Sequence, residues 1–422
     1  MISYTGIHKP YDIGEYSVER NAKVLQRYRF MHEGLLRVMA GQLPARGDWD
    51  LKLGLCRHMY ENAEAANALR GRIPELRTSS AVLGKEPDAV LSLLIDELIH
   101  AENDLELTAG IYAVVKPALL ETYRRHMATT QQIVDQPTLR ILRTIVLDLE
   151  EQVTWGCELQ RMLEDSGVFP AHEPFTDRLR SYIAAAGGID SSLPKTTELP
   201  PRERSTEPYR LPLRSVRDPR TMGPVTWART SMSNAPDDEM GRRVVATMRV
   251  RQEEMTACEL VSGVLYSQRQ MPWSFHRDLA RHVWDEARHA MFGQAALEAE
   301  GYDWKKEPQY TSDYDVNEHK LPGAQYAWLS IGIEEGAMVS NGKKKEFEYF
   351  RDEAKHPLMQ QFQDYDWADE VVHANLGRKW VPELLEEEIA FVREVAKKEL
   401  DHFWSEVNKA TEQWRASKAG NE

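Results

Sequence analysis

A nine-residue pattern, Asp-Glu-x-x-His-Ala-x-x-Gly, occurs twice and pairs a carboxylate with an imidazole at a spacing that suits metal binding. The copies read DEARHAMFG (285–293) and DEVVHANLG (369–377). Residues three apart share a face of an α-helix, so Glu286 with His289, and Glu370 with His373, present two ligands in one direction. Two such helices facing each other in a bundle can hold two metal ions. The repeat therefore predicts a di-metal carboxylate site.

Each motif is preceded by glutamates at a distance that would return the chain to the same height in a helical bundle. Thirty residues separate Glu254 from the first motif, and thirty-three separate Glu335 from the second. This is roughly the length of one helix, a turn and a helix. A bundle-type di-metal site needs one such glutamate from each neighbouring helix. We therefore expect Glu254 and Glu335 to complete the site.

Both upstream glutamates have neighbours that leave the choice open. Glu253 adjoins Glu254, Glu334 adjoins Glu335, and Glu259 is a further rival for the first position. We favour Glu254 and Glu335 because each lies on an apolar helical stripe. The stripes contain Val250, Ala257, Val261 and Val264 in the first case, and Trp328, Ile331, Met338 and Val339 in the second. A buried carboxylate there needs a partner, and the candidates are a metal ion and an arginine.

Asp285 and Asp369 precede the motif glutamates and are predicted to support the histidines from behind. A metal-binding imidazole usually donates its second N–H to a carboxylate or another acceptor, which fixes its tautomer. We expect each aspartate to take this role reciprocally across the site; the alternative is a charge on the helix surface. The small residues Gly293 and Gly377 would let helices approach closely or leave space for a substrate.

The double Glu-x(about 30)-Asp-Glu-x-x-His pattern resembles the ferritin-like di-metal carboxylate proteins. It looks like their oxygen-activating branch, which includes p-aminobenzoate N-oxygenases, acyl-carrier-protein desaturases and ribonucleotide reductase small subunits. The resemblance covers residues 240–380, about a third of the chain. It implies two iron ions, or manganese with iron, that are bridged by carboxylates and react with O2 as co-substrate. The implied metal ligands are Glu254, Glu286, His289, Glu335, Glu370 and His373, with Glu254 and Glu335 also expected to be catalytic.

Two features depart from the families named above. Reductase small subunits carry a radical tyrosine one turn beyond the first histidine, where this chain has Gly293, so a radical-storing subunit is not expected. The N-oxygenases use an additional histidine ligand. His276, His282 and His356 are the candidates for it here, although each is also consistent with an ordinary surface or supporting histidine.

Helical periodicity with scarce strand-like alternation predicts an all-α protein with two helical bundles. Expected helices cover 18–42, 50–71, 87–115, 117–133 and 137–165 in the first bundle, and 240–268, 274–300, 322–354, 357–378 and 382–416 in the second. Between them lie eight prolines from Pro194 to Pro236, which a helix cannot contain. We expect this segment to drape over the surface. The predicted domains are 1–186, a 187–238 linker, and 239–422 with the di-metal site and a C-terminal helix.

The sequence of the first helical bundle resembles that of the second but lacks its expected metal ligands. CRHMYENAEAANAL (56–69) aligns without gaps on ARHVWDEARHAMFG (280–293), and LEEQVTWG (149–156) echoes ADEVVHAN (368–375). Where the second block has ligands, the first has Asn62, Ala65 and Thr154, which cannot rebuild the site. We therefore predict an internal duplication whose first copy, a degenerate ferritin-like domain, has lost its metals.

One further motif argues against the loss of metal binding in the first bundle. Asp96-Glu97-Leu98-Ile99-His100 is a third DExxH, and Glu61 and Glu64 lie at plausible upstream distances. No second DExxH follows in that block, so a complete site there would need unusual ligands. We favour an amphipathic helix with an acidic face, and leave metal binding by Glu97 and His100 as the alternative.

Composition limits the kinds of partner. The net charge of −14 argues against nucleic acid and anionic membranes, which attract basic surfaces. The sequence predicts neither a signal peptide nor a membrane span. Three widely spaced cysteines, Cys56, Cys157 and Cys258, indicate buried thiols in a reducing compartment. A cytoplasmic protein is the default, and its last helix could also support a homodimer.

These features favour a non-haem di-iron (or Mn/Fe) oxidase or monooxygenase acting on a small organic substrate. The rings of Trp284, Phe292, Trp328, Phe362, Tyr365 and Trp367 are candidates for lining its pocket, or for plain core. No dinucleotide fingerprint or cysteine cluster is present. Electrons would then come from a separate donor, such as a ferredoxin or flavin reductase, or from the substrate. The alternative is a non-oxygenating ferritin-like protein for metal storage, peroxide scavenging or a structural metal.

Overall fold

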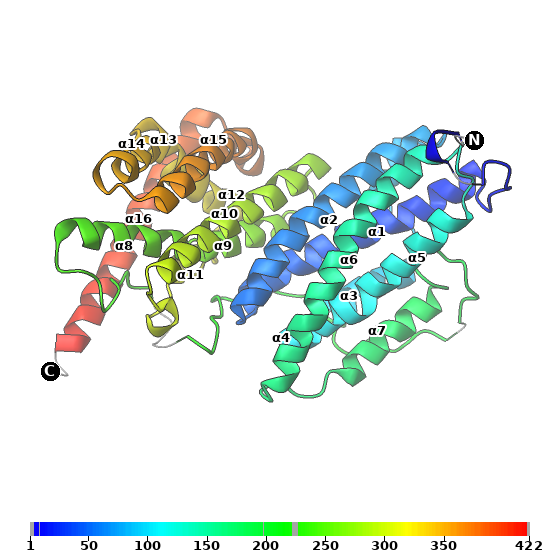
Figure 1. Cartoon of the computed structure of the whole chain (residues 1–422), viewed down its shortest axis with the longest axis horizontal. Coiled ribbons are helices and arrows are strands. Elements are labelled where there is room, and N and C mark those ends of the chain that lie inside the picture. Colours follow the sequence, from blue (N-terminus) through cyan, green and yellow to red (C-terminus); the bar gives the residue numbers. More distant parts are fainter. Residues whose placement is uncertain (1–3, 8, 197, 222–226, 420–422) are drawn as a thin grey trace. The chain divides into compact units, whose positions relative to one another are not determined.

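The computed structural model describes residues 4–7, 9–196, 198–221 and 227–419, and these residues form an all-α protein (Figure 1). Helices and turns account for the ordered elements, and no β-strand occurs within these ranges. The expected fold class is confirmed. None of the helices in the described part of the chain is both long and apolar enough to cross a membrane.

The chain folds into two compact units whose boundary passes through the first two long helices. Unit 1 comprises Met1–Met39 and His58–Arg210, and unit 2 comprises Ala40–Arg57 and Leu211–Glu422. This division differs from the one expected at 186 and 239. The reason lies in residues 40–57, which pack within unit 2. There Lys52 forms a buried ion pair with Glu259, and the ring of Trp49 lies 4.8 Å from that of Trp304.

Unit 1 is built mainly from long helices joined by short turns. They are α1 (Val18–Gln42), α2 (Trp49–Glu75), α3 (Ala89–Leu98), α4 (Asp104–Thr108), the π-helix η4 (Ala109–Val115), α5 (Lys116–Thr129), α6 (Gln136–Asp165) and α7 (Glu173–Ala185), with 3-10 turns η1 (Tyr4–Gly6) and η3 (Ser80–Gly84). The expected helix 87–115 is interrupted after Leu98, because Asn103 caps a new helix by accepting from the N–H of Glu106. Helix α6 packs against α4, η4 and α5.

Unit 2 contains the second series of helices. They are α8 (Glu239–Gln252), α9 (Met255–Ser267), α10 (Trp273–Ala299), α11 (Ser312–Asn317), α12 (Pro322–Tyr326), the π-helix η6 (Ala327–Glu335), α13 (Gly336–Val339), α14 (Gly342–Glu348), the π-helix η7 (Tyr349–Glu353), α15 (Pro357–Leu385) and α16 (Ile389–Ala419), with 3-10 turns η2 (Leu43–Ala45) and η5 (Trp304–Lys306). Helix α10 packs against α8, α9 and α15, and α15 packs against η6.

Two helices expected to be continuous are interrupted in unit 2. The segment 240–268 breaks between α8 and α9 at Glu253 and Glu254. The segment 322–354 breaks at Asn341, whose φ of 55° is left-handed and ends the helical run. The first break turns Glu254 toward α10, so an irregularity in the backbone helps to form the site described below.

The described residues of the proline-rich segment make specific contacts with the unit to which they belong. In unit 1, Arg204 forms an ion pair with Glu106 at 2.7 Å. In unit 2, Arg217 forms an ion pair with Glu259 at 2.5 Å, and the indole N–H of Trp227 donates to Asp315 at 2.9 Å. These buried partners fix the path of a segment that has no helix of its own.

The three cysteines are free thiols. Cys56 and Cys258 are buried and Cys157 is partly buried. Although 56 and 258 are far apart in sequence, their thiols are hydrogen-bonded in unit 2, and burial together with this neighbour raises the pKa of Cys258. Both therefore behave as small core residues.

Candidate metal centre

Carboxylates and imidazoles from both motifs converge inside unit 2. Three groups have ligand atoms within 4.8 Å of one another: His282, Glu286, Glu334 and His373; Glu254, Glu286 and His289; and His289, Asp366 and Glu370. The groups share Glu286 and His289, so they form one continuous cluster. We call the first group position A, and we call Glu254, His289, Asp366 and Glu370 position B, with Glu286 facing both.

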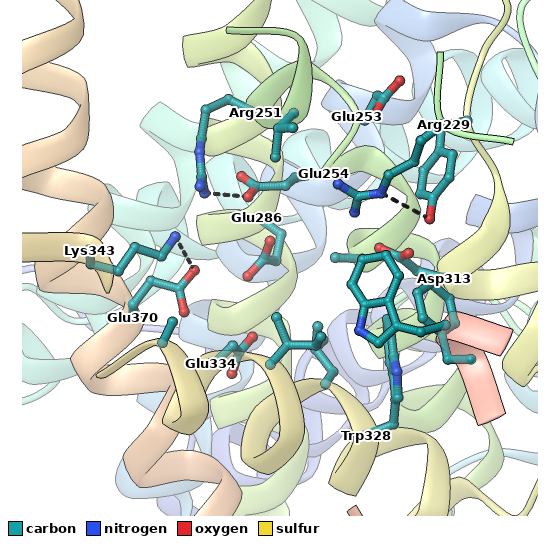
Figure 2. Close-up of a pocket in the computed structure, with 18 of the residues that line it drawn as sticks. Arg229, Arg251, Glu253, Glu254, Glu286, Asp313, Trp328, Glu334, Lys343 and Glu370 are labelled. Carbon is teal, nitrogen blue, oxygen red and sulfur yellow. Dashed lines mark hydrogen bonds and ion pairs between the residues drawn. The ribbon is translucent and has the colours of Figure 1, made fainter. Parts of the chain in front are cut away.

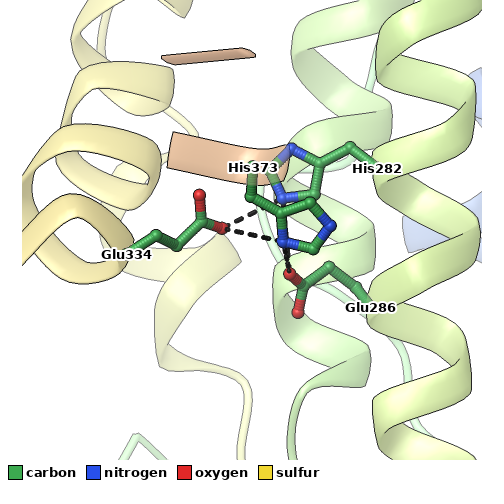
Figure 3. Close-up of side chains that lie close together, drawn as sticks. All are labelled: His282, Glu286, Glu334 and His373. Carbon is green, nitrogen blue, oxygen red and sulfur yellow. Dashed lines mark hydrogen bonds and ion pairs between the residues drawn. The ribbon is translucent and has the colours of Figure 1, made fainter. Parts of the chain in front are cut away.

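Position A joins two imidazoles and two carboxylates (Figure 3). His282 Nε2 lies 3.0 Å from Glu334 Oε1 and 3.3 Å from Glu286 Oε1. His373 Nδ1 lies 3.1 Å from Glu286 Oε1 and 3.7 Å from Glu334 Oε1. The two rings stack at 3.8 Å, and His282 is held from behind by a 3.0 Å hydrogen bond between its Nδ1 and the hydroxyl of Tyr326.

Position B surrounds the imidazole of His289. Its Nδ1 lies 3.4 Å from Glu254 Oε2, 3.4 Å from Asp366 Oδ1 and 3.8 Å from Glu286 Oε2. Asp366 and Glu370 are one turn apart on α15, so their carboxylates point in the same direction. This geometry gives position B three carboxylates of its own for one imidazole.

Two basic side chains also enter position B (Figure 2). Lys343 Nζ lies 2.9 Å from Asp366 Oδ2 and 2.9 Å from Glu370 Oε1. Arg251 donates to Asp366 at 3.0 Å and forms an ion pair with Glu254. The sequence interpretation had not predicted either cation at the site.

The density of carboxylates favours positive charge throughout the cluster. Burial lowers the pKa of His289, but Asp366, Asp369 and Glu254 more than offset it and bring the pKa to about 10. Burial also lowers the pKa of His282 and of His373, and neighbouring carboxylates likewise raise each to about 10. In the absence of a metal ion, protons on these imidazoles would balance the charge. A divalent cation would supply the same balance and displace them.

Asp285 and Asp369 lie behind the imidazoles in the crossed arrangement expected from the sequence. Asp285 Oδ2 is 3.4 Å from Nε2 of His373, and Asp369 Oδ2 is 3.3 Å from Nε2 of His289. Arg288 pairs with both aspartates, at 2.8 Å from Asp369. His289 and His373 therefore face the cluster with Nδ1 and an aspartate with Nε2. The supporting role of the two aspartates stays a prediction.

Glu335 is not in the cluster, and the preference for it over Glu334 is corrected. Its carboxylate accepts hydrogen bonds from Arg378 at 3.1 Å and Arg393 at 2.8 Å. The cause is the π-helix η6, which ends at Glu335 and whose wider turns shift the following residues around the axis. The apolar stripe expected to be buried beside Glu335 does not continue beyond this point, because Val339 is 76% exposed.

The other open choices are settled by the partners of each side chain. Glu254 lies in the cluster, whereas Glu253 pairs with Arg249 at 2.9 Å. Glu259 is fully buried between Lys52 and Arg217, so an ion pair and not a metal accounts for its burial. Glu254, Glu286, His289, Glu370 and His373 are thus brought together as expected.

The sequence contained a signal for two cluster residues outside the six expected ligands. His282 precedes Glu286 by four residues, and Asp366 precedes Glu370 by four. Residues four apart on a helix share a face, so the motif extends to [His/Asp]-x3-Glu-x2-His in both copies. His282, one of three candidates for an additional ligand, is the histidine that lies in the cluster. His356 instead lies 3.2 Å from Glu300.

A cavity of about 200 Å³ opens beside the cluster (Figure 2). Its wall includes Glu254, Glu286, Glu334 and Glu370 on one side, and Arg229, Asp313 and Trp328 on the other. Tyr310, Phe403 and Trp404 also line it. Of the six aromatic residues proposed from the sequence, only Trp328 lines it; Tyr365 is 59% exposed. Burial, reinforced by neighbouring carboxylates, raises the pKa of Asp313 to about 7.

Unit 1 has no comparable group of ligands among its described residues. Asn62 and Ala65 are buried on α2, where Asn62 hydrogen-bonds with His32 at 2.7 Å. Glu97 accepts from Ser205, and His100 Nδ1 donates to the carbonyl of Asp96 at 2.6 Å. Glu97 and His100 therefore have separate protein partners.

Thr154, which aligns with His373 in the expected duplication, is exposed, so it is not a buried counterpart of that histidine. Gly156 of α6 abuts Tyr112 of η4, as Gly377 of α15 abuts Ser330 of η6.

Comparisons with known proteins supply no family for the chain. A scan against protein-family models and searches of curated proteins and solved structures find no match. The argument for function therefore depends on the residues of the site.

These residues fit a metal centre by their unsatisfied atoms. Buried polar atoms without a hydrogen-bond partner include Nδ1 of His289, Nδ1 of His373, and one carboxylate oxygen each of Glu254, Glu334 and Glu370. Leaving buried polar groups unpaired is costly, and these five atoms lie close together in one cluster, although other unpaired atoms occur elsewhere in the described chain. Nitrogen and carboxylate donors in this combination suit iron, manganese and similar divalent ions.

Proposed function

We propose that unit 2 is a non-haem di-metal carboxylate oxidase or oxygenase that uses O2 to oxidise a small organic molecule. The observation that carries the proposal is the convergence of both Glu-x-x-His pairs, with Glu254, Glu334, His282 and Asp366, beside one cavity. When bound, two iron ions, or manganese with iron, supply the reduction of dioxygen. The O2-dependent chemistry is inferred from resemblance to ferritin-like proteins of the oxygen-activating branch.

The chain's own residues would hold and orient the reactants. Glu286, which faces both positions, would contribute to holding an ion at A and at B, while Glu334 would help to hold the ion at A and Glu254 the ion at B. Trp328, Phe403 and Trp404 would exclude water from the cavity. A cavity of about 200 Å³ is below the usual range for drug-sized ligands, so it favours a small substrate.

Asp313 is placed to handle a proton during the reaction. It lines the cavity on the side opposite the ligand groups, and its pKa, raised by burial and by nearby carboxylates to about 7, lets it hold or release a proton near neutral pH. Arg229 also lines the cavity and lies over the rings of Tyr310 and Trp404. Electrons would come from a separate ferredoxin or flavin reductase, or from the substrate.

Anaerobic loading with Fe(II), followed by exposure to air, tests the proposal. We expect two irons per chain, uptake of O2 measured with an electrode, and a new visible absorption. Glu286→Ala should abolish all three, whereas Glu298→Ala on the exposed side of the same helix should leave them unchanged. Iron uptake without reaction with O2 would indicate the non-oxygenating alternative. Absence of bound iron in the unsubstituted protein would exclude both.

A further inference from the structure

The two ligand positions differ in the protein cations that they already contain. Position B holds the ammonium of Lys343, 2.9 Å from both Asp366 and Glu370, and the guanidinium of Arg251, 3.0 Å from Asp366. Within the described chain, no lysine or arginine pairs with His282, Glu286, Glu334 or His373 of position A. All of these groups are buried.

This difference changes the charge that each position offers to a metal ion. Position A has the two carboxylates of Glu286 and Glu334, which match one divalent cation. Position B has three carboxylates, but Lys343 and Arg251 already supply two positive charges to them. The net negative charge that remains at position B is about half that of position A. In a poorly solvated interior this difference strongly changes the attraction for a metal ion.

Lys343 also occupies three of the carboxylate oxygens that a second metal ion could use. Its ammonium donates to both oxygens of Asp366, at 3.0 and 2.9 Å, and contacts Glu370 Oε1 at 2.9 Å. A metal ion cannot coordinate these oxygens while the ammonium lies between the two carboxylates. The side chain of Lys343 also lines the cavity, so it has an adjacent space into which it can move.

We propose that position A is the permanent metal site and that a metal at position B must compete with Lys343. The protein that carries one ion therefore holds the Lys343 ammonium in place of the second. This inference rests on the metal centre of the proposed function and adds an order of filling. Arg251 remains in place in both states, because Glu254 and Glu346 also hold it.

Equilibrium dialysis with Co(II), with cobalt counted by elemental analysis, tests this order on the full chain. The unsubstituted protein should bind one ion tightly and a second at least ten-fold more weakly. Lys343→Met should tighten the second step at least ten-fold and leave the first unchanged. Lys344→Met is the matched control, because this neighbour is half-exposed and pairs only with Glu348 at 3.8 Å; its two steps should equal those of the unsubstituted protein.

Two further variants assign the steps to the positions. Glu334→Gln should weaken the tight step, and Asp366→Asn should weaken only the second. Two equal steps in the unsubstituted protein, or a second step that Lys343→Met does not tighten, would overturn the inference while leaving a two-metal centre intact. No cobalt binding at all would instead contradict the proposed function. If Lys343→Met does not fold, the unsubstituted isotherm and Asp366→Asn still decide.

Discussion

At the scale of single residues, two of the three imidazoles of the cluster lie against aspartates from the opposite helix. Asp285 of α10 lies behind His373 of α15, and Asp369 of α15 lies behind His289 of α10. Such partners fix the tautomer and increase the basicity of a metal-binding histidine. The crossed arrangement also ties the two motif helices together, so metal affinity and helix packing share the same residues.

Asp285→Asn is expected to lower metal affinity about 10- to 100-fold, the usual effect of losing a supporting carboxylate. The amide keeps the size of the side chain but removes its charge. Competition with a chromophoric chelator measures the affinity. Asp278→Asn on the same helix is the control, because Asp278 pairs with Lys379 and Trp380 and not with an imidazole. Equal affinities in the two variants would show that Asp285 does not support His373.

A fully buried lysine is a feature of unit 1. Lys116 is fully buried; its ammonium donates to Gln152, whose amide donates to Glu61 at 2.5 Å. Burial, only partly offset by Glu61 and Asp148, lowers the pKa of Lys116 to about 7. The unfolded chain keeps an ordinary lysine pKa near 10.5, so folding costs more when the side chain must stay charged.

Lys116→Met should stabilise the protein below pH 7 and lose this advantage as the pH rises. Below about pH 7 the lysine is charged in the folded and the unfolded chain, so burial of its charge destabilises the folded state. Between pH 7 and pH 10.5 only the unfolded chain retains the proton, and this destabilisation decreases. We expect a gain on the order of 2 kcal/mol at pH 6, after the lost hydrogen bond to Gln152 is included. Thermal unfolding at pH 6 and pH 10 measures it, with Lys344→Met as the exposed control. An equal effect at both pH values would contradict the buried charge.

At the scale of elements, the π-helix η6 decides which of two adjacent glutamates reaches the cluster. Glu334 lies 3.0 Å from His282, whereas Glu335 faces Arg378 and Arg393. A regular helix through the same residues would have favoured Glu335, which shares a 3.6-residue stripe with Trp328 and Ile331. The wider turns of the π-helix shift the position that faces the cluster by about one residue.

Glu334→Gln is therefore predicted to remove one metal ion per chain, and Glu335→Gln to remove none. Glu335→Gln should cost at most about 1 kcal/mol of stability, because its ion pairs involve arginines that are about half exposed. Metal counting on both purified variants decides the matter. The opposite result would restore the preference based on helical periodicity.

The sequence predicted what depends on regular helices and failed where the backbone departs from them. Both DExxH pairs lie on the uninterrupted helices α10 and α15, so their spacing translated directly into geometry. Glu335 and the helix 322–354 were misplaced because a π-helix and a left-handed residue reset the register. Lys343 was not predicted, because a lysine among surface-like charges carries no sequence sign of burial.

Close packing of α10 against α8 depends on Gly293. A Cβ at this position would overlap the backbone nitrogen of Gln252, so one helix would have to move. Gly293→Ala should cost on the order of 3 kcal/mol and weaken metal binding through Glu254, which follows α8. Gly336→Ala is the control, since a Cβ there meets nothing within 4 Å and alanine favours a helix. Equal unfolding temperatures would contradict this close contact.

At the scale of the whole molecule, the two helical units differ in the buried polar groups that they contain. Among the described residues, unit 2 contains all three groups that could hold a metal ion, and unit 1 has the Lys116 cluster. An internal duplication stays a prediction. It is supported by matched pairs: His58 hydrogen-bonds with Tyr112 at 2.7 Å in unit 1, as His282 does with Tyr326 at 3.0 Å in unit 2.

The expected division of the chain was less successful than the expected helices. Helical periodicity locates α1 and α2 but cannot show that Ala40–Arg57 packs within unit 2. That assignment depends on long-range pairs such as Lys52 with Glu259, which leave no pattern in the local sequence. Composition likewise identified the proline-rich segment but not the ion pairs of Arg204 and Arg217.

The central claim is that metal binds in unit 2, among Glu254, Glu286, Glu334 and Glu370, and not in unit 1. Anomalous diffraction at the iron and manganese edges, from crystals saturated with the metal, tests it most directly. The account predicts two peaks, both among these carboxylates, with the ion beside His282 and His373 at the higher occupancy. No peak at the cluster, or a peak beside Glu97 and His100, would contradict it.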